Sequence, residues 1–191
     1  MKKKILALAA IIITIFTASN LTYTPQLTVR GTENIETVNP SELLNAVADE
    51  AKTDNLIERI TDFASKFLGR KYVWGATGPK SFDCSGFTSY VFKNQGIELP
   101  RTSRMQYTQG ETVSRSDLRA GDLMFFSSPR SGKGRVGHVA IVVSVNPDDN
   151  SLTFIHASSS KGISYQKFPD GGYYSRHYIG AKRVIDSDMV A

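Results

Sequence analysis

The chain has 191 residues, with 23 Lys and Arg against 18 Asp and Glu and a formal net charge of +5. Three of the lysines, Lys2 to Lys4, stand at the start of the chain, and without them the net charge is about +2. The charge therefore indicates no nucleic-acid partner. The single cysteine, Cys84, excludes an internal disulfide.

Residues 1–19 have the three parts of a secretory signal peptide: a charged start, an apolar run from Ile5 to Phe16 and the small residues Thr17-Ala18-Ser19. The apolar run is short for a transmembrane helix, and an uncleaved N-terminal anchor is the alternative. Residues 20–39 are polar and predict a tether. We expect an exported protein, periplasmic or extracellular, with one domain over residues 40–188.

Two helices are predicted at the start of this domain. Asn39 is a suitable cap for a short helix that includes Leu43, Leu44 and Val47. A longer helix follows, because apolar residues from Leu56 to Leu68 recur on one face. Gly69 is expected to end it.

The remaining elements are a loop, two helices and several strands. Residues 71–83 are rich in aromatic and turn residues and predict a loop that leads to Cys84, which begins a helix ended by Gly96. A short helix is expected over 103–109. Short β-rich runs follow at 123–126, 139–145, 152–155, 163–166 and 178–184, and the turn residues 146–150 predict a hairpin between the second and third of them. Helices first and strands later predict an α+β domain.

Cys84 has three readings: inert core filling, an intermolecular link or a nucleophile. Its place at a helix N-terminus favours the thiolate, because unpaired N–H groups and the helix dipole lie there. The polar neighbours Asp83 and Ser85 indicate an accessible site. Gly86 is expected to leave the thiol uncrowded.

Only three histidines occur, and two of them fit a relay with the thiol. His138 stands at the start of one predicted hairpin strand and His156 at the end of its partner, so that the two rings can be neighbours. Nucleophilic catalysis needs a base and a group that orients the base, although a histidine at a strand end is more often a half-buried structural residue. His177 is interpreted as structural. Metal-ligand spacing is absent, so no metal is expected.

Five separated motifs resemble the NlpC-type family of bacterial cell-wall cysteine peptidases, in the family's order and with its approximate spacings. The resemblance covers about residues 57–184 and implies a papain-like α+β fold, with N-terminal helices packed on a five- to six-stranded antiparallel sheet. It implies hydrolysis of γ-D-glutamyl–diamino acid bonds in peptidoglycan stem peptides. The motifs are Tyr72-Val73-Trp74-Gly75 through Phe82-Asp83-Cys84-Ser85-Gly86, Leu99-Pro100-Arg101-Thr102-Ser103, Ala120 to Phe126, Gly137 to Ile141, and Phe154 to Ala157.

The resemblance also assigns roles to individual residues. Cys84 matches the family nucleophile, His138 its base and His156 the residue that orients the base. Tyr72 matches a tyrosine that helps to stabilise the oxyanion. Asp83, Ser85 and Ser103 match positions that, in some members of the family, bind the free amine of the substrate and position its stem peptide.

Two other functions remain open. One is a papain-like amidase or acyltransferase that acts on another acyl substrate, and the other is an inactive module that binds the cell wall. For the hydrolase we expect peptidoglycan or its stem-peptide fragments as partner, no cofactor and a monomer. Ala76 departs from the family, where a second glycine is common after Gly75.

Overall fold

The computed structural model describes residues 27–28 and 37–185. The expected signal peptide, most of the expected tether and the last three residues of the expected domain lie outside them. The chain divides into two units, residues 1–43 and 44–191. In the first, β1 (Leu27–Thr28) pairs antiparallel with β2 (Thr37–Val38). There Asn39 caps a helix, since its Oδ1 accepts a hydrogen bond from the backbone N–H of Ser41 at 3.1 Å.

This helix, α1 (Pro40–Ser65), is continuous, so the expectation of two separate helices was wrong. No glycine or proline interrupts the residues between Val47 and Leu56, and helix propensity carries the chain across them. Among its residues in the second unit, only Leu56, Ile60 and Ala64 are buried. The turn that follows ends at Gly69, whose φ of 80° suits glycine.

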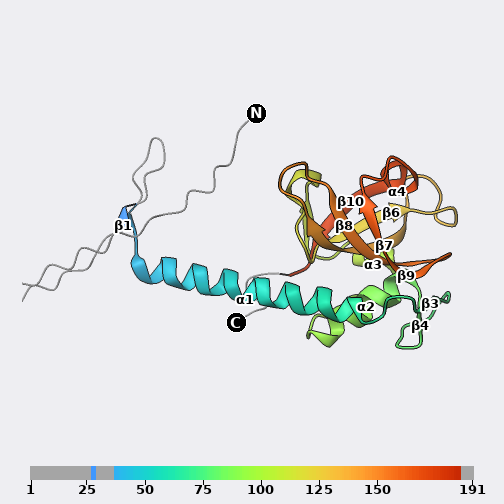
Figure 1. The fold of residues 1–191 in the computed structure, drawn as a ribbon, viewed down its shortest axis with the longest axis horizontal. Helices are drawn as coiled ribbons and strands as arrows, with labels where there is room; N and C mark the ends of the chain where they lie inside the picture. Colours follow the sequence, from blue (N-terminus) through green and yellow to red (C-terminus); the bar gives the residue numbers. More distant parts are fainter. Residues whose placement is uncertain (1–26, 29–36, 186–191) are drawn as a thin grey trace, which may run out of the picture. The chain divides into compact units, whose positions relative to one another are not determined.

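The segment that leads to Cys84 is not a plain loop. It contains β3 (Lys71–Tyr72) and β4 (Ser81–Phe82), which pair in parallel. The helix α2 (Cys84–Asn94) follows directly, and Gly96 lies just beyond its end with a φ of 83°. A short helix, α3 (Ser103–Gln106), comes next. The close pairing of β3 and β4 therefore fixes the approach of the chain to Cys84 (Figure 1).

Six antiparallel strands form the main sheet, in the order β5-β10-β6-β7-β8-β9. This agrees with the expected five- to six-stranded sheet. The shortest strand, at the edge beside β10, was not predicted. The elements are β5 (Glu111–Val113), the 3-10 turn η1 (Arg115–Asp117), β6 (Leu123–Ser127), β7 (Val136–Val145), β8 (Leu152–Ser158), β9 (Gly162–Phe168), the helix α4 (Tyr173–His177) and β10 (Tyr178–Arg183).

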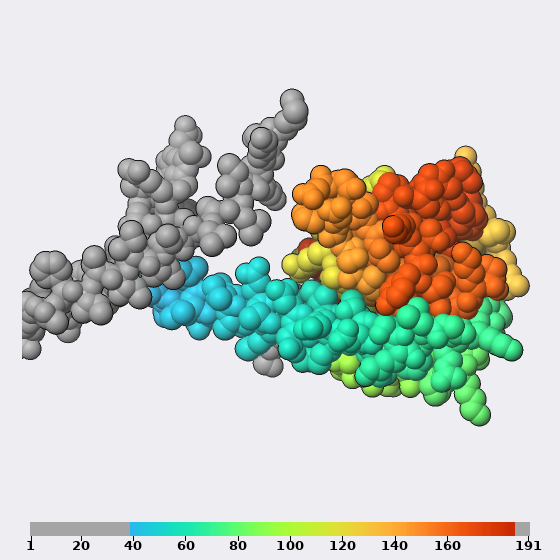
Figure 2. All heavy atoms as spheres, in the orientation of Figure 1, coloured from blue at the N-terminus to red at the C-terminus, as the bar shows by residue number. Residues whose placement is uncertain are grey.

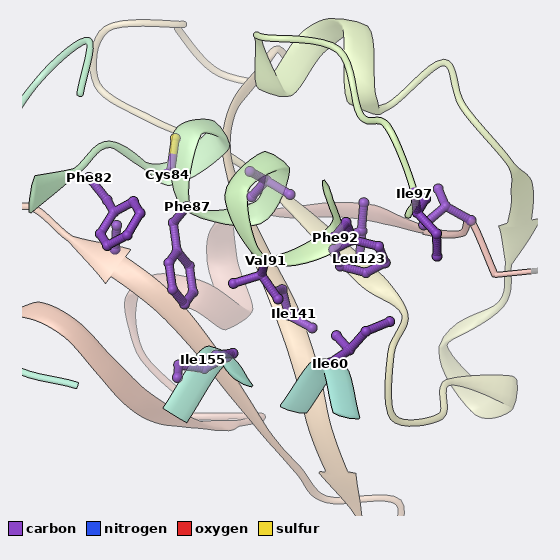
Figure 3. Close-up of a cluster of buried hydrophobic side chains, with 14 of the residues drawn as sticks. Ile60, Phe82, Cys84, Phe87, Val91, Phe92, Ile97, Leu123, Ile141 and Ile155 are labelled. Atoms are coloured by element: carbon purple, nitrogen blue, oxygen red, sulfur yellow. The ribbon is translucent and has the colours of Figure 1, made fainter. Parts of the chain in front are cut away.

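Both faces of the sheet are buried. On one face, buried residues such as Leu123 and Ile141 pack against α1 and α2, as Figure 3 shows around Phe87. In Figure 2 this helical part, in green, lies against the strands, in yellow to red. On the other face, Val113 of β5 and Phe168 of β9 belong to one cluster although their strands are at opposite edges. The sheet therefore curls, and its strands enclose a second core.

The predicted hairpin is confirmed, with β7 and β8 joined through residues 146–150. Its two strands pair only as far as Ile141 and Ile155. Beyond these residues β7 still pairs with β6, and β8 still pairs with β9. The hairpin is thus open at the end that carries His138 and His156. Within residues 37–185, no helix has the length and apolarity needed to cross a membrane.

Candidate active site

Cys84 is the first residue of α2 and lies at the open end of the hairpin. The N-cap Asp83 accepts a hydrogen bond from the backbone N–H of Gly86 at 2.6 Å, which satisfies one free donor of the first turn. The Cys84 side chain points away from Phe87, which enters the core (Figure 3). The backbone N–H of Val139 faces the thiol and lowers its pKa. Because β8 does not pair with β7 at Val139, this donor is available to the sulfur.

The two predicted histidines are adjacent. Nε2 of His138 lies 2.9 Å from Nδ1 of His156, which is a hydrogen-bond distance. The other ring nitrogen of His156 lies 3.4 Å from the hydroxyl of Tyr174 in α4. His138 is half-buried and follows Gly137, whereas His156 is only 2% exposed. The structure thus adds a tyrosine to the expected pair of histidines.

Burial shifts the reactive groups toward their neutral forms. It lowers the pKa of His138 to about 4. It also raises the pKa of the Cys84 thiol, and the negative charge of Asp83 adds to this rise. Hydrogen bonds from backbone amides, including that of Val139, oppose the rise. The donors at the helix N-terminus therefore lower the pKa of the thiol as expected, but burial and Asp83 raise it by more.

Tyr72, at the end of β3, shares the electrostatic environment of the thiol. Burial raises the pKa of its hydroxyl, and the charges of Cys84 and Asp83 raise it further. The hydroxyl therefore stays protonated at neutral pH and can donate a hydrogen bond. Arg130 and Arg101 act on this pKa in the opposite direction, which places Tyr72 near a basic region of the site.

The carboxylate of Asp83 has several partners. Its two oxygens accept hydrogen bonds from Arg101 at 2.6 and 3.2 Å. The backbone N–H of Gly75 donates to it at 3.0 Å. Asp83 therefore fixes the loop, the helix start and Arg101 to one another, and Arg101 also donates to Ser85 at 3.1 Å.

A cleft of ≈ 690 Å3 opens over the thiol. Cys84 lines it together with the three residues expected to bind substrate, Asp83, Ser85 and Ser103. Its walls come from the β3–β4 segment, from α3 and from the loop between β6 and β7. Sequence reasoning did not assign the other side chains along it, among them Trp74, Arg101, Arg104, Ser128 and Arg130.

Gly86 has a different role from the expected one. A Cβ atom on Gly86 would overlap the carbonyl oxygen of Ala76, so the glycine permits the β3–β4 segment to approach the helix. The backbone N–H of Asp83 donates to that same carbonyl at 2.9 Å. Close backbone packing, rather than space around the thiol, therefore accounts for Gly86.

Gln106 was also missed. It is fully buried and accepts a hydrogen bond from the hydroxyl of Thr88 at 2.8 Å. Its amide donates to the carbonyl oxygens of Ser85 and Pro100 and to the hydroxyl of Ser89. Gln106 thus ties α3 to the first turns of α2. Its position in the polar run after Pro100 gave no signal of burial.

Among the described residues, no group of three or more His, Cys, Asp or Glu side chains is arranged to hold a metal ion. The third histidine, His177, lies apart from the pair. Its ring stacks on that of Tyr173 with centroids 4.0 Å apart, and its Nδ1 lies 2.7 Å from the carbonyl oxygen of the same residue.

The fold is that of the papain-like α+β class, and comparison with known proteins gives the family. The model of the NlpC/P60 family matches residues 69–183. A Staphylococcus aureus protein described as similar to a lipoprotein of the NLP/P60 family has a crystal structure with a TM-score of 0.61 and 38% identity, covering 70% of this chain and 42% of that one. The chain belongs to the NlpC/P60 family, which confirms the resemblance and the fold expected from sequence.

Three curated relatives are similar over different lengths. The Escherichia coli "Murein DD-endopeptidase MepS/Murein LD-carboxypeptidase" is 34% identical over 76% of this chain and 75% of its own length. The "Probable endopeptidase p60" of Listeria seeligeri is 48% identical over 50% of this chain, but only 18% of that protein is covered. The "Gamma-D-glutamyl-L-lysine dipeptidyl-peptidase" of Bacillus cereus is 39% identical over 62% of this chain and 34% of its own length.

Proposed function

We propose that this protein is an exported cysteine endopeptidase that hydrolyses the γ-D-glutamyl–diamino acid bond of peptidoglycan stem peptides. The observation that carries the proposal is the 2.9 Å contact between the rings of His138 and His156 on two strands, β7 and β8, against which the helix that begins at Cys84 packs. A nucleophile, a base and an orienting group are thereby supplied by α2, β7 and β8. The relatives that act on murein or on a γ-D-glutamyl bond support the substrate class.

In the proposed reaction, the thiol proton of Cys84 passes to His138 as the sulfur attacks the carbonyl carbon of the scissile amide. The backbone N–H of Cys84 and the hydroxyl of Tyr72 donate to the oxyanion. The C–N bond then breaks, and His138 protonates the leaving amine, which leaves a thioester on Cys84. Water, deprotonated by His138, hydrolyses the thioester and releases the glutamyl product and the free thiol.

The direction of the hydrogen bonds decides whether His138 can be the base. If Nε2–H of His138 donates to His156, Nδ1 of His138 is unprotonated and can accept the thiol proton. His156 then carries its own proton on Nε2 and donates it to the oxygen of Tyr174, 3.4 Å away. The opposite direction would protonate Nδ1 of His138. Tyr174 is therefore proposed as the acceptor that keeps His138 in its basic form.

The test of the activity is cleavage of L-Ala-γ-D-Glu-diaminopimelate and of its lysine counterpart, followed by mass spectrometry. A cross-linked peptide with a D,D bond is included, because that is the bond in the E. coli relative's name. We expect release of the diamino acid by the wild type and none by Cys84→Ala. Cleavage of the D,D bond alone would refute the proposed bond but keep the peptidase. No cleavage with a reactive Cys84 would favour an amidase or acyltransferase.

The orienting role of His156 is tested with a matched pair of variants. Loss of the correct tautomer in a catalytic triad costs up to about 10⁴-fold in rate, so His156→Ala is expected to lower kcat strongly. His177→Ala removes the third histidine, which lies outside the site, and should keep wild-type kcat. Equal kcat in both variants would remove His156 from the mechanism.

The oxyanion role of Tyr72 is tested by Tyr72→Phe. Loss of one oxyanion donor costs on the order of 100-fold in kcat, and KM should change little. Tyr165→Phe is the control, because Tyr165 is 47% exposed on β9. Unchanged kcat in Tyr72→Phe would leave the oxyanion to backbone donors alone.

Residues 1–19 are proposed as the export signal, residues 20–39 as a tether and residues 40–188 as a monomeric catalytic domain. Cell fractionation with and without residues 1–19 tests the export, because the truncated chain should stay in the cytoplasm. Size-exclusion chromatography with light scattering tests the oligomeric state.

A further inference from the structure

The cleft over Cys84 carries an excess of positive charge. Its charged lining residues are one carboxylate, that of Asp83, and three guanidinium groups, those of Arg101, Arg104 and Arg130. The salt bridge between Arg101 and Asp83 balances one of the three. Within residues 37–185, Arg104 and Arg130 have no carboxylate within 4 Å. Two positive charges therefore face the cleft without a balancing group in the described structure.

Both arginines are held in position by their surroundings. Nε of Arg104 donates to the carbonyl oxygen of Val136 at 3.1 Å, which fixes the side chain between α3 and β7. The guanidinium of Arg130 lies 4.5 Å from the ring centroid of Trp74, across the cleft from its own loop. A guanidinium on an aromatic face keeps its N–H donors at the edge free for an acceptor. Fixed donors lose less entropy when they bind a ligand.

The loop that carries Arg130 is itself built by buried hydrogen bonds. The hydroxyl of Ser131, which is 7% exposed, donates to the carbonyl oxygen of Arg135 at 2.7 Å and accepts from the backbone N–H of Ser128 at 2.9 Å. A Cβ atom on Gly137 would overlap both serine hydroxyls, so the glycine is required where the loop returns to β7. Arg130 thus projects from an ordered turn.

Guanidinium groups bind carboxylate and phosphate through charge-assisted hydrogen bonds, and the proposed stem-peptide substrate supplies carboxylates. A glutamyl residue linked through its γ-carboxyl keeps its α-carboxylate, and a diamino acid on the other side of the scissile amide has a carboxylate of its own. Conversion of either group to a carboxamide removes its charge and changes its size little. A site of this kind would therefore distinguish two forms of one peptide.

We propose that Arg104 and Arg130 form a carboxylate-binding subsite in the Cys84 cleft, which selects stem peptides with a free carboxylate beside the scissile amide over their amidated forms. This inference rests on the proposed peptidase function, which supplies the substrate. It adds a selectivity to that function, namely that the cleft prefers the charged peptide to its amidated form.

The first experiment compares kcat/KM for three peptides: the tripeptide with both carboxylates, the form with the glutamyl α-carboxamide, and the form with a carboxamide on the diamino acid. Each carboxamide form is compared with the tripeptide that has both carboxylates. In one of these two comparisons we expect kcat/KM to be about tenfold or more higher for the free carboxylate, as for a charge-assisted hydrogen bond. The comparison that shows the preference identifies which carboxylate binds. Equal rates for all three peptides would overturn the proposal.

The variants assign this preference to the two arginines. Arg104→Gln and Arg130→Gln should each reduce the preference, and the double variant should abolish it. Lys133→Gln is the matched control, because it removes one positive charge from the same loop but Lys133 does not line this cleft. A preference that survives in the double variant would overturn the assignment.

A second measurement needs no peptide cleavage. Cys84 is the only cysteine, so iodoacetate and iodoacetamide both report on this site. Iodoacetate is an anion and iodoacetamide is neutral. The alkylation rate with iodoacetate divided by that with iodoacetamide therefore does not depend on the reactivity of the thiol and reports the effect of charge in the cleft. The ratio should fall several-fold in the double variant at low ionic strength and stay close to the wild-type value in Lys133→Gln. If no peptide is cleaved, the proposed function fails, and this ratio still decides whether the arginines select anions.

Discussion

At Cys84, two opposing influences act on one thiol. The helix N-terminus and the backbone N–H of Val139 favour the thiolate, whereas burial and the Asp83 carboxylate oppose it and raise the pKa. Burial also keeps the neighbouring His138 neutral, with a pKa of about 4. These pKa shifts predict a neutral thiol and a neutral imidazole in the free protein, with proton transfer from Cys84 to His138 when the substrate binds. An ion pair formed before substrate binds is not required.

The pH dependence of alkylation tests this state. The rate with iodoacetamide should increase with pH throughout the neutral range and reach half of its maximum only above the ordinary cysteine pKa of about 8.5, because the thiolate is the reactive form. The urea-unfolded protein provides the reference titration of the same thiol. A rate that is already constant between pH 5 and 7 would instead indicate a thiolate–imidazolium pair.

Tyr174 provides a second test at the scale of one residue. Tyr174→Phe removes the acceptor for Nε2–H of His156, so that the basic form of His138 loses its advantage. We expect kcat to fall about tenfold, the size of one neutral hydrogen bond, with KM unchanged. Tyr173→Phe is the control, since its ring stacks on His177 instead of facing the histidine pair. If both variants kept wild-type kcat, Tyr174 would have only a packing role.

Among the elements, the contact between α2 and α3 depends on Gln106. Gln106→Ala would remove four buried or part-buried hydrogen bonds, those with Thr88, Ser85, Ser89 and Pro100, although the hydroxyl of Thr88 would still donate to the carbonyl oxygen of Ser85. Each such hydrogen bond contributes about 0.5–1.5 kcal/mol, so the free energy of unfolding in urea should fall by at least about 2 kcal/mol. Gln109→Ala changes an exposed glutamine a few residues away and should leave it within about 0.5 kcal/mol of the wild type.

Elements with strong local patterns were predictable from sequence. The strands from β6 to β10 have apolar runs between turn residues, and the hairpin predicted from the sequence brings His138 near His156. The three-residue strand β5 has no such pattern, and its position comes from pairing with β10. The continuity of α1 is not evident from the sequence, because the residues just before Leu56 are mostly polar and do not continue its apolar face. They form mostly solvent-exposed helix.

The composition of the cleft was harder to predict than the positions of Cys84, His138 and His156 in the fold. Trp74, Arg104 and Arg130 belong to three segments that are far apart in sequence, and no periodicity connects them. They meet because α3 and the β6–β7 loop pack beside the start of α2. Similarly, Tyr174 follows a glycine pair that gave no sign of a contact with His156. Such contacts depend on tertiary packing, which a single sequence does not display.

For the folded unit as a whole, the buried histidines predict instability in acid. The pKa of His138 is lowered to about 4 and that of His156 to about 2, both by burial, and the charge of His138 contributes to the second shift. An unfolded histidine titrates near pH 6.5. Between pH 6.5 and 4 the unfolded chain therefore binds more protons than the folded one, and stability is lost as the pH falls.

The measurement is the free energy of urea unfolding at several values between pH 7.5 and 5. Each proton taken up only on unfolding gives a slope of about 1.4 kcal/mol per pH unit. The half-buried His138 should contribute less than the fully buried His156. His156→Gln should therefore lower the slope, while His177→Gln should keep it. A stability that does not change over this range would show that both histidines are accessible to protons when folded.

The proposed nucleophile and the proposed base come from opposite halves of the chain. Cys84 precedes the exposed turn η1, and His138 and His156 follow it. A cut within Arg115–Asp117 would give two fragments that share an interface, the contact of α2 with β7 and β8. Neither fragment would have a complete set of reactive groups. Hydrolysis would then return only where the two pieces meet, so this architecture is suited to a split-protein reporter of molecular proximity.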